Sequence, residues 1–391
     1  MTTHRRARPL RLAFVTIRYG PNVLGGAETA VRELAEKLAE RGDHVEVFAT
    51  CTNDPRRWNN TLPAGDENIN TVPVHRFPIR WTNRSRYEEL LRGQLAKQDE
   101  QFEWLHDGPH SPEIYQTLAR RAHEFDLLFF APYLFSVVQY AAAIAPARSI
   151  IWPCLHDEPF AYFVPTQIML RGSHGLMFNS EPERVFAMNK LGVKHPRAFV
   201  VGCGMRQPAS DGERFRRKSG VTDPFVLYSG RLDIAKNVPL LIDYFGRYKK
   251  AHPGSLKLVL MGRGTSINLP DIIQIGFQPA EDKPDVFAAA SVLCQPSVNE
   301  SFSIVLMESW LAGTPVMVHG DCNVTRCHVT QSGGGLYFSN YDEFEEVLRL
   351  ITANSDLNQR MGESGQRYVL KHYDWDAVLG RFDEAVKSWM P

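Results

Sequence analysis

Short apolar runs and amphipathic stretches alternate along nearly the whole chain. The first run covers residues 12–17, and a second run at residues 45–49 follows a stretch in which apolar residues recur every three or four positions. The apolar positions of that stretch are Val31, Leu34, Ala35 and Leu38. This spacing puts apolar side chains on one face of a helix, whereas short uninterrupted runs are typical of parallel strands covered on both faces. The pattern predicts a strand, a helix that ends at Gly42, and a second strand.

The alternation continues through the first half of the chain, with two interruptions. Further strands are predicted at residues 127–130, 149–154, 176–178 and 198–201. Residues 80–112 are rich in Arg, Glu, Trp and Gln and contain no matching strand, which indicates a helical insertion. Residues 203–224 are polar and contain Gly and Pro, a composition typical of a linker.

The pattern restarts after this linker. Strands are predicted at residues 225–229, 257–261, 272–275, 292–295 and 315–318, and helices at 237–251, 302–312, 341–352, 357–371 and 375–389. We therefore expect an α/β protein with two Rossmann-like, doubly wound domains, residues 1–205 with an insertion at about 80–112, and residues 206–372. The C-terminal helix within residues 373–391 is expected to pack back toward the first domain. Such sheets bind ligands beyond the carboxyl ends of their strands, so we expect the two domains to face each other across one cleft.

Composition narrows the classes of function. The 391 residues contain 44 Lys and Arg against 44 Asp and Glu, and this zero net charge argues against a nucleic-acid binder. The 6 cysteines are too few and scattered for a disulfide framework, so a reducing cytoplasm is expected. No run reaches the ~18 consecutive apolar residues of a membrane span, and the stretch after Arg5 and Arg6 is too short and too charged for a signal sequence. A peripheral contact of the basic N-terminal residues with the inner face of the membrane stays open.

Residues 297–316 contain two carboxylates around a predicted helix start. The backbone N–H groups of Ser303, Ile304 and Val305 should be unpaired there, and the helix dipole favours an anion such as a phosphate. Glu300 would lie beside the group attached to that phosphate, and Glu308 one or two turns away. Ionised carboxylates suit sugar hydroxyls because they accept hydrogen bonds with both oxygens. On the pattern alone, an ordinary capped helix with two solvated glutamates is as good an interpretation as an anion site.

A second cluster follows the first strand of the second half. Gly230 allows a tight turn, and Arg231 and Lys236 place two cations near the carboxyl end of that strand. Two cations opposite a helix N-terminus could hold a diphosphate, although a pair of surface cations is the commoner case. Because two separate candidate anion sites occur in one half of the chain, a ligand-binding role is favoured over surface cations and a capped helix.

These motifs together resemble one family. Gly230-Arg231 with Lys236, the pair Glu300-x7-Glu308 and Gly313-x-Pro315 are similar to family 4 of the retaining, nucleotide-sugar-dependent glycosyltransferases, which have the GT-B fold of two facing Rossmann-like domains. The resemblance extends over essentially the whole chain. Three further matches support it, namely the glycine-rich loop with Gly25 and Gly26, the Gly-x-Gly segment with Gly262 and Arg263, and His156.

The resemblance implies a role for each matching residue. Arg231 and Lys236 would hold the donor diphosphate, Glu300 would contact the donor sugar near its reactive carbon, and Glu308 would bind the ribose hydroxyls. Gly26 would let the backbone approach the phosphate, and His156 would face the donor sugar. The implied catalytic residues are Glu300, His156, Arg231 and Lys236. The implied donor-binding residues are Gly25, Gly26, Gly230, Arg231, Lys236, Gly262, Arg263, Glu300, Ser303, Ile304, Val305 and Glu308.

The resemblance also implies the reaction. In a hexosyltransferase of this kind, the acceptor hydroxyl attacks the sugar from the face that the diphosphate leaves, and the departing phosphate takes the acceptor proton. No metal and no cofactor are expected, and UDP is favoured as the nucleotide on family frequency alone. The acceptor would be a glycan, a lipid-linked or a small molecule in glycan, polysaccharide or glycolipid synthesis. Ser301 stands where the family commonly has glycine, which leaves the donor sugar open.

Several other residues have simpler interpretations. Asp374 and Asp376 are expected to cap the last helix rather than bind a metal. His319, Cys322, Cys327 and His328 lack the Cys-x2-Cys spacing of a zinc site. The acceptor is expected on the first domain, with Arg80, Trp81, Arg84 and Arg86 as candidate determinants, although a solvated helical face is the commoner reading of such residues.

Other classes of protein remain as alternatives. A GT-B-type epimerase would share the donor site, whereas a phosphorylase needs a longer chain or a cofactor lysine. A non-catalytic sugar- or nucleotide-binding protein of the periplasmic kind would need a signal peptide. A nicotinamide-dependent oxidoreductase would need Gly-x-Gly-x-x-Gly after the first strand, and residues 20–25 do not fit that pattern.

Overall fold

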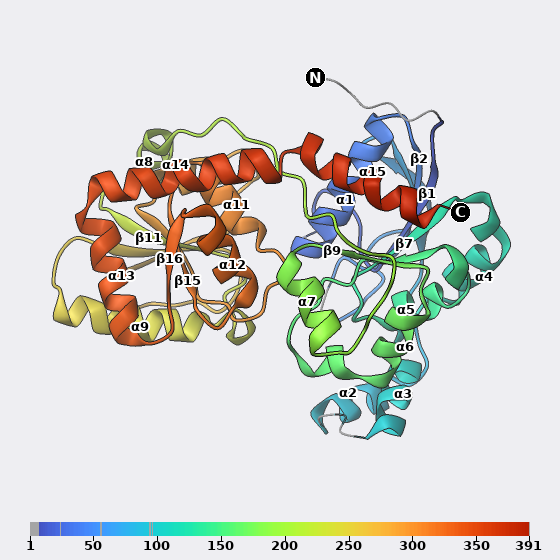
Figure 1. The fold of residues 1–391 in the computed structure, drawn as a ribbon. Coiled ribbons are helices and arrows are strands. Elements are labelled where there is room, and N and C mark those ends of the chain that lie inside the picture. The colour runs from blue at the N-terminus through green and yellow to red at the C-terminus, as the bar shows by residue number, and fades with distance from the viewer. Residues whose placement is uncertain (1–7, 24, 55–56, 94, 96, 391) are drawn as a thin grey trace. The chain divides into compact units, whose positions relative to one another are not determined.

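The computed structural model describes residues 8–23, 25–54, 57–93, 95 and 97–390. These residues divide into two compact units (Figure 1). Unit 1 comprises Met1–Gly204 together with Val378–Pro391, and unit 2 comprises Met205–Ala377. Each unit is a largely parallel β-sheet covered by helices, so the α/β class predicted from the alternating pattern is confirmed.

The sheet of unit 1 has the strand order β10-β9-β8-β7-β1-β2-β4-β3. Its strands are β1 (Arg11–Thr16), β2 (His44–Thr50), β3 (Gly65–Ile69), β4 (Val72–Phe77), β7 (Leu127–Ala131), β8 (Ser149–Ile151), β9 (Gly175–Phe178) and β10 (Ala198–Val200). The pairs are parallel except that β3 runs antiparallel to β4. The chain order reverses between β1 and β7, which makes the carboxyl ends of these two strands the switch point of the sheet.

Helices cover both faces of this sheet. They are α1 (Gly26–Glu40), α4 (Pro112–Arg121), α5 (Ser136–Ala142), α6 (Val164–Gly172), α7 (Glu181–Asn189) and α15 (Trp375–Trp389), with 3-10 turns η1 (Ala122–Glu124), η2 (Pro146–Arg148) and η3 (Pro159–Tyr162). The insertion forms β5 (Arg80–Trp81), α2 (Arg84–Arg92), α3 (Gln98–Asp107) and β6 (Pro109–His110). The predicted helical character of the insertion is confirmed, and a short β5–β6 pair closes its base.

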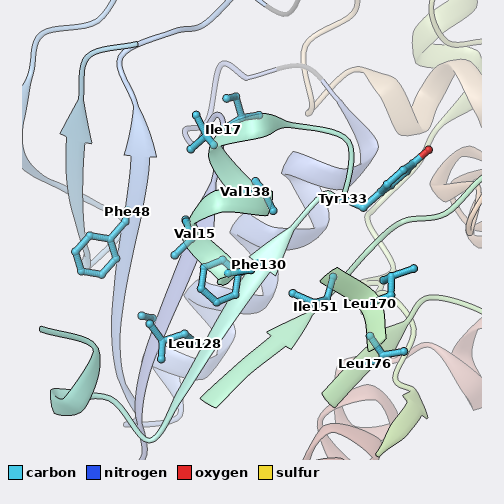
Figure 2. Packing of buried hydrophobic residues seen from close by; sticks show 14 of the residues in the cluster. Val15, Ile17, Phe48, Leu128, Phe130, Tyr133, Val138, Ile151, Leu170 and Leu176 are labelled. Carbon is cyan, nitrogen blue, oxygen red and sulfur yellow. The ribbon is translucent and has the colours of Figure 1, made fainter. Parts of the chain in front are cut away.

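The core of unit 1 explains its continuous apolar runs. Val15, Leu128 and Phe130 are at most 1% exposed and pack with Phe48 and Val138 (Figure 2). Side chains on both faces of β1 and β7 are buried, so the strands need apolar residues at every position instead of an alternation. On the opposite face, Phe129 packs against Phe382 and Trp389 of α15 at ring-centroid distances of 5.6 and 5.9 Å.

The sheet of unit 2 is parallel throughout, with the order β13-β12-β11-β14-β15-β16. Its strands are β11 (Phe225–Ser229), β12 (Lys257–Met261), β13 (Ile272–Gly276), β14 (Val292–Gln295), β15 (Val316–His319) and β16 (Gly335–Phe338). Its helices are α8 (Gly212–Ser219), α9 (Val238–Ala251), α10 (Lys283–Ala289), α11 (Ile304–Leu311), α12 (Asn323–Ser332), α13 (Tyr341–Ala353) and α14 (Ser355–His372), with the 3-10 turn η4 (Ile234–Lys236). The strands and helices predicted after residue 224 are confirmed to within about two residues.

The predicted linker at 203–224 is wrong in part, because residues 212–219 form helix α8. The Asp211 carboxylate caps this helix by accepting the N–H groups of Glu213 and Arg214. Phe215 is the one side chain of α8 that is buried, and its ring lies 5.9 Å from that of Phe225. A two-turn helix anchored by one apolar residue carries no periodic signal, so its composition resembles a linker.

Candidate functional site

Two of the predicted residues form an ion pair at the carboxyl edge of the unit 2 sheet. The Nζ atom of Lys236 lies 2.7 Å from Oε1 of Glu300. Lys236 ends η4, which follows β11, and Glu300 lies in the loop after β14, the neighbouring strand. The side chains are 22% and 10% exposed, so the pair is largely shielded from water but still reachable.

Two side chains that sequence analysis missed hold this pair in place. The Asn237 amide donates to the carbonyl oxygen of Pro296 at 3.0 Å and ties the loop after β11 to the loop after β14. Gln295 donates to Oε1 of Glu300 at 3.4 Å. The carboxylate therefore receives a cation and an amide on the same oxygen, and within the described ranges Oε2 can still accept a further hydrogen bond. Gln295 ends β14 and Asn237 follows the turn η4, and a lone amide side chain at either place has no distinctive spacing, so no sequence signal pointed to either.

Helix α11 begins beside Glu300 in the manner expected of an anion site. Ser303 is its N-cap with φ 69° and ψ 76°, a left-handed conformation that costs a residue other than glycine about 1–3 kcal/mol. Ser303 is buried, and its hydroxyl is without a hydrogen-bond partner in the described part of the chain. The backbone N–H of Leu306 donates to the Ser303 carbonyl, so the N–H groups of Ser303, Ile304 and Val305 precede the first bond of the helix. Backbone N–H groups in the first turn of a helix are suited to meet an anion.

Arg231 and Glu308 occupy more open positions. Arg231 is 61% exposed, and its guanidinium lies 3.3 Å from the Asp233 carboxylate. The Lys283 ammonium group at the start of α10 lies 2.6 Å from both carboxylate oxygens of Glu308. Lys283 was not predicted, because 25 positions separate it from its partner and no motif contains it.

The glycine segments bring two loops of unit 2 close together. A Cβ atom on Gly262 would collide with the carbonyl oxygen of Gly230. The N–H of Gly230 donates to the Met261 carbonyl at 2.9 Å, which holds the loops after β11 and β12 in register. Arg263 follows Gly262 and lies over the ring of Phe277 at 5.4 Å. The two predicted glycine positions thus serve one close backbone approach at the carboxyl edge of the sheet.

In unit 1 the glycine-rich loop is shaped by a buried ion pair. Gly25 is the N-cap of α1 and Gly26 its first residue. Glu28 pairs with Arg18, and both side chains are 7% exposed. A Cβ atom on Gly25 would collide with the Glu28 carboxylate. The requirement for glycine at position 25 therefore has a structural cause besides any ligand.

His156 lies in the loop after β8 and also belongs to unit 1. Its side chain is 31% exposed, and Nδ1 is 3.7 Å from Oε1 of Glu158. The same carboxylate oxygen accepts a hydrogen bond of 2.7 Å from the Tyr133 hydroxyl. A half-buried imidazole beside a carboxylate can donate or accept a hydrogen bond at the surface of the unit.

The cations of the insertion have partners within unit 1. Arg80 pairs with Glu113, and Arg84 lies 2.9 Å from Glu88. Arg84 also lies 5.0 Å from the ring centroid of Trp81. Arg86 bridges two further glutamates at 2.8 and 2.9 Å. These contacts favour the interpretation of the insertion as a solvated helical face.

The remaining candidates have structural roles. Oδ1 of Asp374 accepts the N–H of Asp376 at 2.9 Å, which confirms the predicted helix cap. His328 is buried, Nδ1 lies 3.0 Å from the Tyr368 hydroxyl, and burial lowers the pKa of His328 to about 4. Across the described ranges, no three His, Cys, Asp or Glu side chains gather as metal ligands would. A search of the same ranges finds no helix with the length and apolarity needed to span a membrane.

Comparisons with known proteins identify the family. The Glycosyl transferase 4-like domain model matches residues 25–204, and the Glycosyl transferases group 1 model matches residues 210–368. The D-inositol 3-phosphate glycosyltransferase of Xylanimonas cellulosilytica is 24% identical over 94% of this chain and 94% of its own. The alpha-monoglucosyldiacylglycerol synthase of Streptococcus pneumoniae is 22% identical over 90% of this chain and 80% of its own.

Solved structures support the same fold. Sucrose-phosphate synthase from Thermosynechococcus elongatus has a TM-score of 0.71 at 16% identity and covers 97% of this chain and 98% of its own. Anabaena Alr3699/HepE, in complex with UDP and glucose, has a TM-score of 0.69 at 19% identity and covers 97% of this chain and 100% of its own. With a glycosyltransferase domain matched in each of its two units, the chain is a GT-B glycosyltransferase of the family 4-like kind.

Proposed function

We propose that this glycosyltransferase transfers a hexose from a UDP-sugar to an acceptor hydroxyl, with retention of the anomeric configuration and without a metal ion. The observation that carries the proposal is the Lys236–Glu300 pair beside the N-terminus of α11. This arrangement would supply a cation and the first backbone N–H groups of a helix to a diphosphate, and a carboxylate to the attached sugar. The resemblance assigns these same residues to the donor.

The charges at this site suit the breaking of a sugar–phosphate bond. Negative charge grows on the leaving diphosphate, where Lys236, Arg231 and the α11 amides would stabilise it. Positive charge grows on the sugar, which the Glu300 carboxylate would stabilise. These groups do for the leaving group what a divalent cation does in metal-dependent transferases. In family 4 the departing phosphate takes the acceptor proton, and His156 and Glu300 are the remaining candidates for contact with the sugar.

The names of related proteins support the choice of substrates. The Anabaena neighbour was solved with UDP and glucose, which favours a UDP-hexose donor. Among the relatives, one is named for D-inositol 3-phosphate and another for a diacylglycerol glycolipid. We therefore place the acceptor among polyol, glycan and lipid-linked hydroxyls and the reaction in glycan or glycolipid synthesis.

The test is a product analysis. The protein is incubated with UDP-glucose, UDP-galactose and UDP-N-acetylglucosamine, each with a panel of polyol, oligosaccharide and diacylglycerol acceptors. We expect one donor to yield a product that keeps the α-anomeric linkage of the donor. The coupling constant between the anomeric proton and the proton on C2, measured by NMR, gives this configuration. A β-linked product would contradict retention, and an epimerised donor without a linked product would contradict sugar transfer.

A further inference from the structure

The Glu183 carboxylate bridges two loops of unit 1. Glu183 is the third residue of α7 and is 1% exposed. Its Oε2 atom accepts the backbone N–H of Asn179 at 2.6 Å, and its Oε1 atom accepts the backbone N–H of Leu155 at 2.6 Å. Asn179 follows β9, and Leu155 lies in the loop after β8, the neighbouring strand. One side chain therefore fastens together the carboxyl ends of two adjacent strands.

Helix capping explains one of these two bonds. Glu343 has the same position in α13, and its Oε2 atom accepts the N–H of Ser339, the residue before the N-cap, at 2.7 Å. Glu183 makes the equivalent bond to Asn179, which precedes the N-cap Ser180. The bond to Leu155 has no counterpart in that arrangement, because Leu155 belongs to a different loop. Glu343 thus shows what capping alone requires, and the second bond of Glu183 needs another explanation.

Leu155 immediately precedes His156, so the position of the Leu155 backbone determines the position from which the His156 side chain extends. Cys154 has φ 57°, a left-handed conformation that persists in residues other than glycine only when neighbouring contacts enforce it. The Asn179 side chain supplies part of that enforcement, since it accepts the Trp152 indole N–H at 2.6 Å and donates to the Cys154 sulfur at 3.4 Å. Glu183 fixes the next residue along the loop.

The chemistry of this contact requires a carboxylate. Each oxygen accepts a different N–H, and an amide side chain has only one oxygen. Gln at position 183 would set its own NH₂ group against either Leu155 or Asn179. Burial raises the pKa of Glu183, while the backbone N–H groups that its two oxygens accept lower that pKa and favour the ionised form.

We propose that Glu183 is a positioning residue that fixes the backbone at Leu155 and thereby holds His156 in place during sugar transfer. The inference rests on the proposed function, in which His156 takes part in the reaction. The competing explanation is a purely structural role, in which Glu183 only stabilises the start of α7.

The experiment measures turnover, UDP affinity and stability of Glu183→Gln in the full-length protein, with Glu343→Gln as the matched control. We expect kcat of Glu183→Gln to fall by roughly 10- to 100-fold, because small displacements of a reacting group cost this much. The dissociation constant for UDP, measured by calorimetry, should stay within about twofold, since Lys236, Arg231 and Glu308, which are proposed to hold the nucleotide, belong to unit 2. Glu343→Gln should lose some thermal stability and keep its kcat. If Glu183→Gln does not fold, Glu183→Asp, which is too short to span both loops, takes its place with the same expectations.

A double-mutant cycle separates positioning from a structural role. In a His156→Ala background, adding Glu183→Gln should lower kcat by less than about twofold, because Glu183 acts through His156. A full additional loss in that background, unchanged kcat in the single variant, or a parallel loss of UDP affinity would each overturn the inference. Wild-type turnover in His156→Ala would instead refute the catalytic assignment of His156 in the proposed function. Amide hydrogen exchange at Leu155, which Glu183→Gln should accelerate and Glu343→Gln should not, tests the contact without any activity.

Discussion

Lys236 and Glu300 are 64 positions apart in the chain, yet Nζ of Lys236 lies 2.7 Å from Oε1 of Glu300. The fold brings them together because β11 and β14 are neighbours in a parallel sheet and each residue follows the carboxyl end of its strand. Before a donor binds, each charge is compensated by the other. In the proposed function, a bound diphosphate would draw Lys236 toward itself and leave the Glu300 carboxylate to the sugar, so the two residues would serve the two halves of a nucleotide sugar.

The first prediction concerns the two cations of the diphosphate site. Lys236→Ala and Arg231→Ala should each lower kcat by on the order of 10²-fold, because both act on charge that develops in the transition state. The Lys236 effect should be larger, since Lys236 is 22% exposed and Arg231 61%. Steady-state kinetics check this, with Arg349→Ala as a control cation on the surface of α13. Wild-type turnover in Lys236→Ala would remove this residue from the mechanism.

Substitutions of Glu300 and Glu308 should change different kinetic constants. Glu308→Gln should mainly raise the donor KM, because the ribose does not change during the reaction, and Glu300→Gln should mainly lower kcat. Kinetics with varied donor concentration distinguish the two effects. The reverse pattern would mean that the donor lies in the opposite orientation at this site.

Lys283 should act through Glu308. Its ammonium group occupies one lone pair on each carboxylate oxygen, which leaves one on each for the two ribose hydroxyls. We expect Lys283→Met to raise the donor KM by roughly tenfold, the equivalent of one charge-assisted hydrogen bond, with kcat nearly unchanged. Lys283→Arg should restore most of the affinity. A fall in kcat with an unchanged KM would contradict this role.

The main residues of the candidate site in unit 2 could be predicted from the sequence, whereas most of the contacts that support the site could not. Lys236 and Glu300 each follow an apolar strand, so strand order alone places them at one edge. Lys283, Asn237 and Glu183 reach partners in other loops or helices, and no local pattern reports such a contact. Helix 302–312 was predicted slightly too long because Ser303 adopts a left-handed backbone that a periodicity argument does not detect.

Strand β3 is an element of the fold that the hydrophobic pattern did not predict. Its residues are exposed at four of five positions, so it lacks the apolar run that identified β1 and β11. It pairs antiparallel with β4 at the edge of the sheet, where one partner strand satisfies its backbone. Pairing, not burial, defines this strand, and pairing cannot be seen in the sequence alone.

The histidine at position 75 should make stability depend on pH. His75 lies 2.9 Å from Glu46 and 2.7 Å from Asp66, and its hydrogen bond to Glu46 is the main cause of a raised pKa. A raised folded-state pKa stabilises the fold fully below the unfolded value of about 6.5, and that contribution is lost as the pH rises through the folded pKa. His75→Gln should therefore lower Tm more at pH 5.5 than at pH 9. An equal loss at both pH values would show that His75 contributes by packing alone.

Activity should survive treatment with EDTA. In the proposed function, Lys236, Arg231 and the N–H groups at the start of α11 would supply the positive charge that a leaving diphosphate needs, in place of a divalent cation. The assay compares turnover before and after chelation and again after dialysis. Loss of turnover that added Mn²⁺ or Mg²⁺ restores would contradict the metal-independent mechanism.

The proposed function requires that the Lys236–Glu300 site of unit 2 binds the diphosphate of a nucleotide sugar. Calorimetric titration of the wild type and of Lys236→Met with UDP and with uridine tests it most directly, since neither the sugar nor the acceptor needs to be known. We expect the wild type to bind UDP at least about 10²-fold more tightly than uridine, and Lys236→Met to lose most of that difference. UDP binding by Lys236→Met with wild-type affinity would show that this site does not hold the diphosphate.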